Sequence, residues 1–406
     1  QTLNLSSVRK YQTSSDRDTR HDVAAAMWGW FDANVTRLDA LYDELVRVRT
    51  GMARKLGYPN YIKLGYARMG RVDYDQQDVE RWRAQVRDVV VPLAARIRAA
   101  QASSLGLASL NLWDEGIFDP RGNPAPRGDR AWMVERATEM FDAMHPELAG
   151  LFREMNRLEL LDLDTRDGKA PGGFCTGLPK WGMPFIFANF TGTMHDSHVF
   201  THEMGHAFQA WKSRDLPLVD YHWPTSDGAE IHSISLEFLC MPYIEKFFGD
   251  DAGRFDRVHL MESLLFMPYG VAVDHFQHLI YENPDATPAE RHAMWRQLEQ
   301  TYLPWRDHGD LPHTPRGGFW QTQRHIYLAP FYYIDYTLAQ ACALQFWVKS
   351  RENYGRALED YVALCGRGGS LPFQSLARSA GLISPFDAGC LDAVARAAAD
   401  ALGVSA

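Results

Sequence analysis

A chain of 406 residues can bury a large core, and 46% apolar with 23% charged residues is usual for a folded globular protein. The net charge of -9 and the pI near 5.9, without a dense run of Lys and Arg, argue against a nucleic-acid-binding surface. No apolar run approaches the length of a membrane span, and the five scattered cysteines form no C-x-x-C pair. We therefore expect a cytoplasmic protein with reduced thiols and no membrane partner.

The first part of the chain has the apolar spacing of helices. Residues 16–57 predict two long helices in a hairpin, with Gly57 at the end, and residues 77–105 predict another helix that Pro92 bends or splits. Residues 119–127, rich in Pro and Gly, predict a loop, and residues 131–158 are helical again. We expect residues 1–160 to form a helical scaffold lobe. Because the sequence starts with Gln1 rather than Met, we also expect that a missing N-terminal segment or a partner chain completes this lobe.

Residues 161–193 change in character. Six glycines break this segment into turns, while residues 174–176 and 183–190 have the β-branched and aromatic bias of short strands. We expect a small sheet directly before the next helix. One interpretation is a hairpin that packs for stability. The other is an edge strand that pairs with an extended peptide through its backbone.

The strongest motif is H-E-M-G-H at residues 202–206. On a helix His202 and His206 lie one turn apart, so both imidazoles can bind one metal ion. Glu203 lies about 100° around the helix from His202 and can reach a water on that ion, where a general base belongs. The alternative is two partly buried histidines on an amphipathic helix. Asp196 or Ser197 would cap this helix at its start.

A catalytic zinc site needs a third protein ligand and one open position. Glu230 and Glu237 are seven residues apart on one face of the following helix, so one can bind the ion while the other orients a ligand histidine. Glu230 has an alternative role, because Asp227-x-x-Glu230 is also a capping box. The residues alone leave ligand and cap open. We expect His232 to be structural, and the same holds for His259, His275 and His278.

A late cluster joins His325 to four tyrosines between residues 327 and 336. Peptide hydrolysis passes through a tetrahedral oxyanion, which neutral donors such as tyrosine hydroxyls or an imidazole N–H stabilise. Tyr333 and Tyr336 are three residues apart and share a helical face. The alternative is an aromatic core stripe whose hydroxyls reach the surface.

These motifs together resemble one known family. The first motif is H-E-M-G-H-x-x-Q, and E-x-x-S-x-x-x-E follows 24 positions after its second histidine, with F-Y-Y-x-x-Y later in the chain. This combination is similar to the oligoendopeptidase F branch of the thimet oligopeptidase family of zinc metallopeptidases. The resemblance extends from about Arg54 into the C-terminal third. Family members are usually longer at the N-terminus, so this chain is expected to be a fragment or to have a more open channel.

The resemblance implies a mainly α, two-lobed helical metallopeptidase with a small β-sheet beside the H-E-x-x-H helix and a deep substrate channel. Residues 161–406 would be the catalytic domain, and short unstructured peptides would be the substrates. The implied metal is Zn²⁺, one ion per chain, although cobalt or manganese would suit the same donors. The alternatives are a catalytically inactive peptide-binding relative and a helical zinc carboxypeptidase.

The resemblance also assigns residues to roles, by position in this sequence. His202, His206 and Glu230 would bind zinc, with Glu203 as the base. Glu237 and Asp196 would support the site from outside the ligand set. Substrate and oxyanion contacts are implied for His325, Tyr333 and Tyr336. The glycine-rich segment and the strand that follows it would bind substrate, and their implied residues are Gly172, Gly173, Phe187 and Ala188.

Overall fold

The computed structural model describes residues 8–405 and divides the chain into two compact units, each built from several segments. Of the described residues, unit 1 comprises 8–10, 123–260 and 339–384, and unit 2 comprises 11–122, 261–338 and 385–405. Gln1 and the other residues at 1–7, with residue 406, lie outside the described residues. The predicted domain boundary between residues 160 and 161 stays a prediction.

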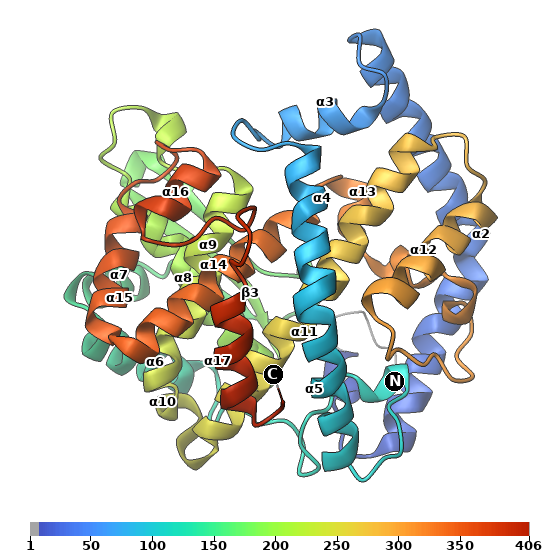
Figure 1. The fold of residues 1–406 in the computed structure, drawn as a ribbon. Helices are drawn as coiled ribbons and strands as arrows, with labels where there is room; N and C mark the ends of the chain where they lie inside the picture. The colour runs from blue at the N-terminus through green and yellow to red at the C-terminus, as the bar shows by residue number, and fades with distance from the viewer. Residues whose placement is uncertain (1–7, 406) are drawn as a thin grey trace. The chain divides into compact units, whose positions relative to one another are not determined.

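Unit 2 is helical. Its first long element is α2 (Arg17–Lys55), a single helix of 39 residues that is drawn unbroken in blue in Figure 1. The predicted hairpin is therefore wrong. No proline interrupts this stretch, and Gly29 and Gly51 are tolerated inside the helix. Asp16 caps the start of α2, and the helix ends two residues before Gly57, as predicted.

Next to Pro92, where the sequence predicts a bend or a split, the helical run is irregular but continuous. The α-helix α4 (Gln76–Gln85) continues through a π-helical turn, Val86–Val90, into α5 (Val91–Ser104). Proline has no N–H to donate, and the wider π turn directly before it accommodates the missing bond. The remaining described helices that lie within unit 2 or reach into it are α1 (Arg9–Gln12), α3 (Tyr61–Arg68), α11 (Ala252–Glu282), α12 (Pro288–Tyr302), α13 (Arg324–Leu328), α14 (Tyr333–Glu352) and α17 (Asp392–Leu402).

Unit 1 combines helices with the small predicted sheet. The loop at 119–127 is confirmed, and the helical stretch after it is two helices, α6 (Arg130–Met144) and α7 (Pro146–Arg157), separated at His145. The strands are β1 (Leu161–Asp164), β2 (Phe174–Leu178) and β3 (Met183–Phe190). The other helices are α8 (Met194–Lys212), α9 (Ser226–Cys240), α10 (Glu245–Phe248), α15 (Tyr354–Cys365) and α16 (Phe373–Ser379), with parts of α11 and α14. Helix α9 ends at Cys240, and short 3-10 and α turns follow it.

The sheet has the order β1-β3-β2. β1 pairs with β3 in parallel and β2 pairs with it in antiparallel fashion, so β3 is the central strand. Residues of β3 alternate between buried and partly exposed, as expected for a strand with one face on a core. The predicted strand at 183–190, which the resemblance implies faces the substrate, is thus paired on both sides. Among the described strands, the edges that remain for an added strand belong to β1 and β2.

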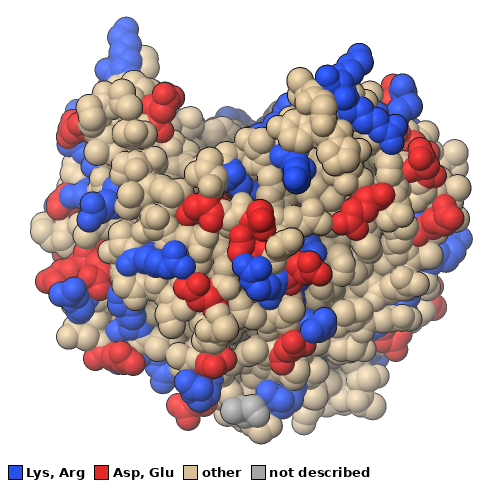
Figure 2. Space-filling view, turned by 45° about the horizontal axis from the view of Figure 1, so that its top comes forward, with Lys and Arg blue, Asp and Glu red and all other residues tan. Residues whose placement is uncertain are grey.

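The fold as a whole is mainly helical with a small three-stranded sheet that precedes the H-E-x-x-H helix, as predicted. No described helix combines the length and apolar character that crossing a bilayer requires. On the face in Figure 2, basic and acidic side chains are interspersed rather than gathered into separate fields. The predicted deep channel stays a prediction.

Candidate metal centre

The H-E-x-x-H motif lies in α8, packed closely against α9. A Cβ added to Gly205 would lie 2.6 Å from the Cα of Ser233 and 2.7 Å from the backbone oxygen of His232, both in α9. Only glycine permits this approach of two helix backbones without displacement. The glycine between the two histidines therefore brings Glu230, also in α9, into their reach.

Three donor atoms converge at this contact. Oε2 of Glu230 lies 3.2 Å from Nε2 of His202 and 3.4 Å from Nε2 of His206. The three atoms lie within 4.8 Å of one another, and these side chains form the one cluster of at least three His, Cys, Asp or Glu residues suited to a metal among the described residues. Glu230 is buried and also accepts a hydrogen bond from Ser233 Oγ at 2.9 Å.

The spacing of these atoms fits a metal ion. A tetrahedral ion with bonds of about 2.0–2.1 Å to nitrogen and oxygen separates its ligand atoms by about 3.3 Å. The observed separations of 3.2 and 3.4 Å bracket that value. His202 is also oriented correctly, because its Nδ1 lies 2.8 Å from Oε1 of Glu237, which leaves Nε2 for an ion.

Electrostatics tie the three side chains together. Burial opposes the charged forms of His202 and Glu230, but the opposite charge of each group outweighs it. The pKa of His202 is raised well above its usual value by Glu230 and Glu237. The pKa of Glu230 is held well below its usual value by His206 and His202. The site thus favours an ionised Glu230 carboxylate that faces a positively charged His202 ring.

Glu203 lies on the same helix as the two histidines and is buried, with 6% of its surface exposed. Its Oε2 atom has no hydrogen-bond partner among the described residues. Burial raises the pKa of this carboxyl above its ordinary value of 4.5, despite the nearby imidazoles of His202 and His206. A buried carboxylate without a partner has a high affinity for a proton.

The segment before β2 approaches Glu203. A Cβ on Gly173 would lie 3.3 Å from Oε1 of Glu203 and 3.3 Å from the backbone oxygen of Phe187. Gly172 has a φ of +99°, and its carbonyl accepts a hydrogen bond from the Asn189 side chain at 2.9 Å. The glycine-rich segment is thus adjacent to the H-E-x-x-H helix.

The other two residues predicted to bind substrate lie in the centre of the sheet. Phe187 is partly buried and stacks on Phe174, with the ring centroids 4.9 Å apart. Ala188 is fully buried, and its backbone oxygen accepts a hydrogen bond from Lys169. Neither residue lies in an edge strand.

Two predicted capping roles are wrong. The N-cap of α8 is Thr193, and Asp196 lies in the first turn, where its carboxylate accepts backbone hydrogen bonds from Thr191 and Gly192 at 2.6–3.0 Å. Asp196 therefore stabilises the start of α8 instead of the ligand histidines. The capping-box alternative for Glu230 also fails, because Thr225 is the N-cap of α9 and the Glu230 carboxylate faces the histidines.

His232 does not join the ligand set. It is buried, and its Nδ1 lies 2.8 Å from the backbone oxygen of Gly228. His259 lies beside the ligand set, with its Nε2 3.6 Å from Oε2 of Glu237. Both fit the structural roles that the sequence predicts.

In unit 2, the predicted donor cluster is assembled around the start of α14. The ring of His325 lies 5.1 Å from that of Tyr333 and 5.8 Å from that of Tyr336. Directly before α14, Phe331 has a φ of +68°, and its carbonyl accepts a hydrogen bond from Arg71. Arg71 also pairs with Asp335 at 2.6 Å, so a buried ion pair secures this turn.

Two residues beside the ligands were given no role by the motif. Gln209 lies one turn after His206 and is fully buried, and Trp223 stacks on the His206 ring with centroids 5.7 Å apart. Gln209 is the last residue of the H-E-M-G-H-x-x-Q motif, so the sequence itself could have pointed to a role at the site. No local pattern marks Trp223, because a loop carries it to the site.

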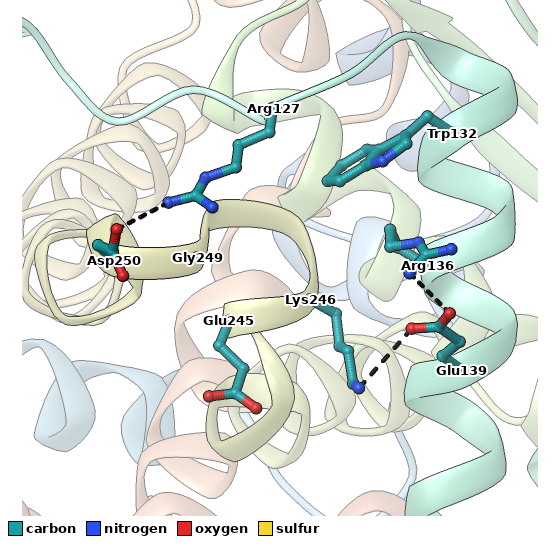
Figure 3. Close-up of a pocket in the computed structure, with 8 residues that line it drawn as sticks. All are labelled: Arg127, Trp132, Arg136, Glu139, Glu245, Lys246, Gly249 and Asp250. Carbon is teal, nitrogen blue, oxygen red and sulfur yellow. Dashed lines mark hydrogen bonds and ion pairs between the residues drawn. The ribbon is translucent and has the colours of Figure 1, made fainter.

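A surface pocket in unit 1 is a weaker candidate (Figure 3). Its cations are paired: Arg127 with Asp250 at 3.3 Å, and Arg136 and Lys246 with Glu139 at 2.6 and 3.7 Å. The pocket therefore offers little unpaired charge to a ligand. Its lining residues are Arg127, Trp132, Arg136, Glu139, Glu245, Lys246, Gly249 and Asp250.

Comparisons with known proteins agree with this site. Residues 136–396 match the profile of peptidase family M3. No curated protein matches the chain. Among solved structures, PZ peptidase A with an inhibitor is 47% identical, with a TM-score of 0.96, and the match covers 99% of this chain and 71% of that one.

Two further structures are described as oligoendopeptidase F. One is 48% identical, with a TM-score of 0.96 and coverage of 99% of this chain and 71% of that chain. The other, from Bacillus anthracis strain Ames, is 43% identical, with a TM-score of 0.89 and coverage of 98% and 69%. A family match over residues 136–396 and identities above 40% across nearly the whole chain establish the relationship. The chain therefore belongs to peptidase family M3, a family of metallopeptidases.

Proposed function

We propose that this protein is a zinc metalloendopeptidase that hydrolyses short unstructured peptides. The observation that carries the proposal is the convergence of His202 Nε2, His206 Nε2 and Glu230 Oε2 at the spacing of a tetrahedral metal. Two histidines and a carboxylate are a standard ligand set for catalytic zinc. One ion per chain would be bound.

Zinc, when bound, supplies a Lewis acid that polarises a carbonyl and makes water a stronger nucleophile. Glu203 acts as the base. It takes a proton from the attacking water and later gives that proton to the leaving amine. The raised pKa of its buried carboxyl supports the first step, since a stronger base accepts the proton more readily.

Glu237 orients His202 in this proposal. Its 2.8 Å contact with Nδ1 selects the tautomer whose Nε2 lone pair faces the metal. The contacts of His202 on both sides, Glu230 at Nε2 and Glu237 at Nδ1, support this assignment.

We also propose that an extended peptide adds to the sheet at β2. β2 pairs with β3 on one side only, within the part of the chain that the structure describes. Gly173 directly precedes β2, and the site of its missing Cβ is 3.3 Å from Glu203 Oε1. Backbone pairing requires no particular side chain, which suits an enzyme for varied peptides.

The oxyanion is assigned to neutral donors. We propose that Tyr333, Tyr336 and His325 donate hydrogen bonds to substrate, which their mutual packing supports. Tyr336→Phe removes one hydroxyl and should lower kcat by about 10–10³-fold.

We propose a cytoplasmic location. The proposal is supported by the five cysteines, which are all free thiols, because the cytosol keeps thiols reduced. The proposed partners are peptide substrates. A partner chain or a further N-terminal segment stays part of the proposal, since the relatives above are longer than this chain.

One experiment tests the proposed function. An unstructured ten-residue peptide is incubated with the protein, with and without a chelator, and its fragments are identified by mass spectrometry. Internal cleavage that the chelator abolishes and zinc restores is the expected result. Release of single C-terminal residues would instead indicate a carboxypeptidase, and an intact peptide would indicate an inactive binding protein.

A further inference from the structure

The two ligand histidines are oriented in different ways. His202 has Glu237 on its second ring nitrogen, at 2.8 Å. Nδ1 of His206 is buried and has no hydrogen-bond partner among the described residues. A metal-binding histidine usually uses its second nitrogen to set the ring orientation. His206 therefore needs another means of orientation.

We propose that Trp223 is a positioning residue that orients the imidazole of His206 for metal binding. This inference rests on the proposed function, because it takes His206 as a ligand. The Trp223 and His206 rings lie with centroids 5.7 Å apart and an interplanar angle of 29°, an offset stack. The second side-chain torsion of histidine is broad and intrinsically permits several ring orientations. A flat indole against one face of the imidazole restricts that rotation.

The loop that carries Trp223 is held by hydrogen bonds to the C-terminal end of α8. The backbone oxygen of His222, the preceding residue, accepts hydrogen bonds from Gln209 Nε2 at 3.1 Å and from Ser213 Oγ at 2.7 Å. Gln209 and Ser213 are further joined to each other, side chain to side chain, at 2.8 Å. The loop that carries Trp223 is thus attached to the same helix that carries His206.

A second attachment comes from the glycine turn after α15. The backbone N–H of Gly369 donates to the oxygen of Tyr221 at 2.8 Å. A Cβ on Gly369 would lie 2.5 Å from the backbone oxygen of Trp223, so the two backbones are in close contact. The backbone on either side of the indole is therefore supported from both α8 and the 366–369 turn. This arrangement also explains the glutamine in H-E-M-G-H-x-x-Q, one helical turn beyond the second ligand.

A purely structural role for Trp223 makes a different prediction. If the indole only packed the loop, its loss would lower stability and leave the metal site unchanged. If it orients His206, its loss changes metal affinity and ligand geometry even in protein that folds normally. Metal affinity and the absorption spectrum of bound Co²⁺ distinguish the two, and neither requires catalysis.

The test compares three variants in the absence of peptide. Trp223→Met removes the aromatic face, Trp223→Phe keeps a smaller one, and Trp211→Met is the matched control. Trp211 lies in the same helix as His206 but contacts Phe208 and Arg214. Zinc dissociation constants are measured by competition with a chromophoric chelator, and visible spectra are recorded after loading with Co²⁺.

We expect Trp223→Met to raise the zinc dissociation constant by roughly 10-fold and to shift the Co²⁺ absorption bands. This is the lower end of the roughly 10–100-fold loss of metal affinity that follows when a residue that orients a metal ligand is replaced. Trp223→Phe should recover most of the affinity, and Trp211→Met should match the wild type. Should Trp223→Met fail to fold, Gln209→Leu tests the same link. Gln209→Leu should also weaken zinc binding, by about 3-fold, which is half of the 10-fold effect on the scale of binding free energy.

Folded Trp223→Met, or Gln209→Leu in its place, with wild-type zinc affinity and an unchanged Co²⁺ spectrum would overturn the inference while leaving the metal site intact. A wild-type protein that binds neither Zn²⁺ nor Co²⁺ would instead refute the proposed function. The two failures are therefore distinguishable.

Discussion

Oε1 of Glu237 lies 2.8 Å from Nδ1 of His202, on the side of the ring opposite Glu230. One helix, α9, thus supplies both a proposed ligand and the group that orients another ligand. The seven-residue spacing of the two glutamates places them on one face, two turns apart. The site depends on this face meeting the histidines of α8.

Glu237→Gln tests the orienting role directly. The amide cannot accept from Nδ1–H with the strength of a carboxylate, and its NH₂ group can donate instead, so the His202 tautomer is less well defined. We expect the zinc dissociation constant to rise by about 10–100-fold. Chelator competition measures it, with Glu245→Gln, an exposed position in the following turn, as the control. Equal zinc affinity in both variants would remove Glu237 from the site.

Gly205→Ala tests the helix contact. The added methyl would meet the α9 backbone at 2.6 Å, so the helices must separate. We expect a loss of about 1–3 kcal/mol in the free energy of unfolding, and weaker zinc binding because Glu230 moves with α9. Gly150→Ala in α7, where nothing lies within 4 Å of the new Cβ, should instead stabilise by about 0.5–1 kcal/mol. Urea titrations of both variants give the comparison; a neutral Gly205→Ala would contradict the close approach.

Gly173→Ala tests the position of the proposed base. The new methyl would lie 3.3 Å from Glu203 Oε1, so the carboxylate shifts by a few tenths of an ångström. We expect kcat/KM to fall by about 10-fold with little change in stability, since small misplacements of catalytic groups are costly. Gly150→Ala, in α7 with open space at its Cβ, is the control. If the two variants have the same kcat/KM, Gly173 is not required for the alignment of Glu203.

The buried carboxyl of Asp256 predicts that the stability of the fold depends on pH. Burial raises the pKa of this carboxyl from 3.8 to about 7, so the folded state holds a proton that the unfolded state releases. Asp256 therefore contributes stability below about pH 4, which is lost as the pH rises to about 7.

Asp256→Asn should remove this loss of stability between about pH 4 and 7, because the amide does not ionise. The difference in the free energy of unfolding between the variant and the wild type should therefore favour the variant by about 1–3 kcal/mol more at pH 8 than at pH 4.5. Urea titrations at both pH values measure this difference, and exposed Asp400→Asn is the control. A difference independent of pH would show that Asp256 is not protonated in the folded protein at pH 4.5–7.

The sequence predicted the elements that have strong local signals. The helical H-E-x-x-H turn, the strands at 183–190 and near 174, and the irregular turn next to Pro92 depend on residue patterns within a few positions. The contact of Glu237 with His202 followed from the face that Glu237 shares with Glu230. These features require little knowledge of distant packing.

Other features depended on contacts that no local pattern encodes. Residues 17–55 form one helix because nothing in the chain breaks it, and the pattern of apolar residues could not exclude a turn. The central position of β3 depends on β1, a four-residue strand with a weak signal. Trp223 reaches His206 through a loop held by Gln209, and only the tertiary structure reveals that link.

Glu203→Gln, measured for both bound zinc and peptide cleavage, tests the central claim most directly. The substitution keeps the shape of the side chain and leaves His202, His206 and Glu230 in place, so bound zinc should equal that of the wild type. Without a carboxylate to take the proton, kcat/KM for a ten-residue peptide should fall by about 10²–10⁴-fold. A variant that binds zinc and cleaves the peptide at nearly the wild-type rate would contradict the assignment of Glu203 as the base.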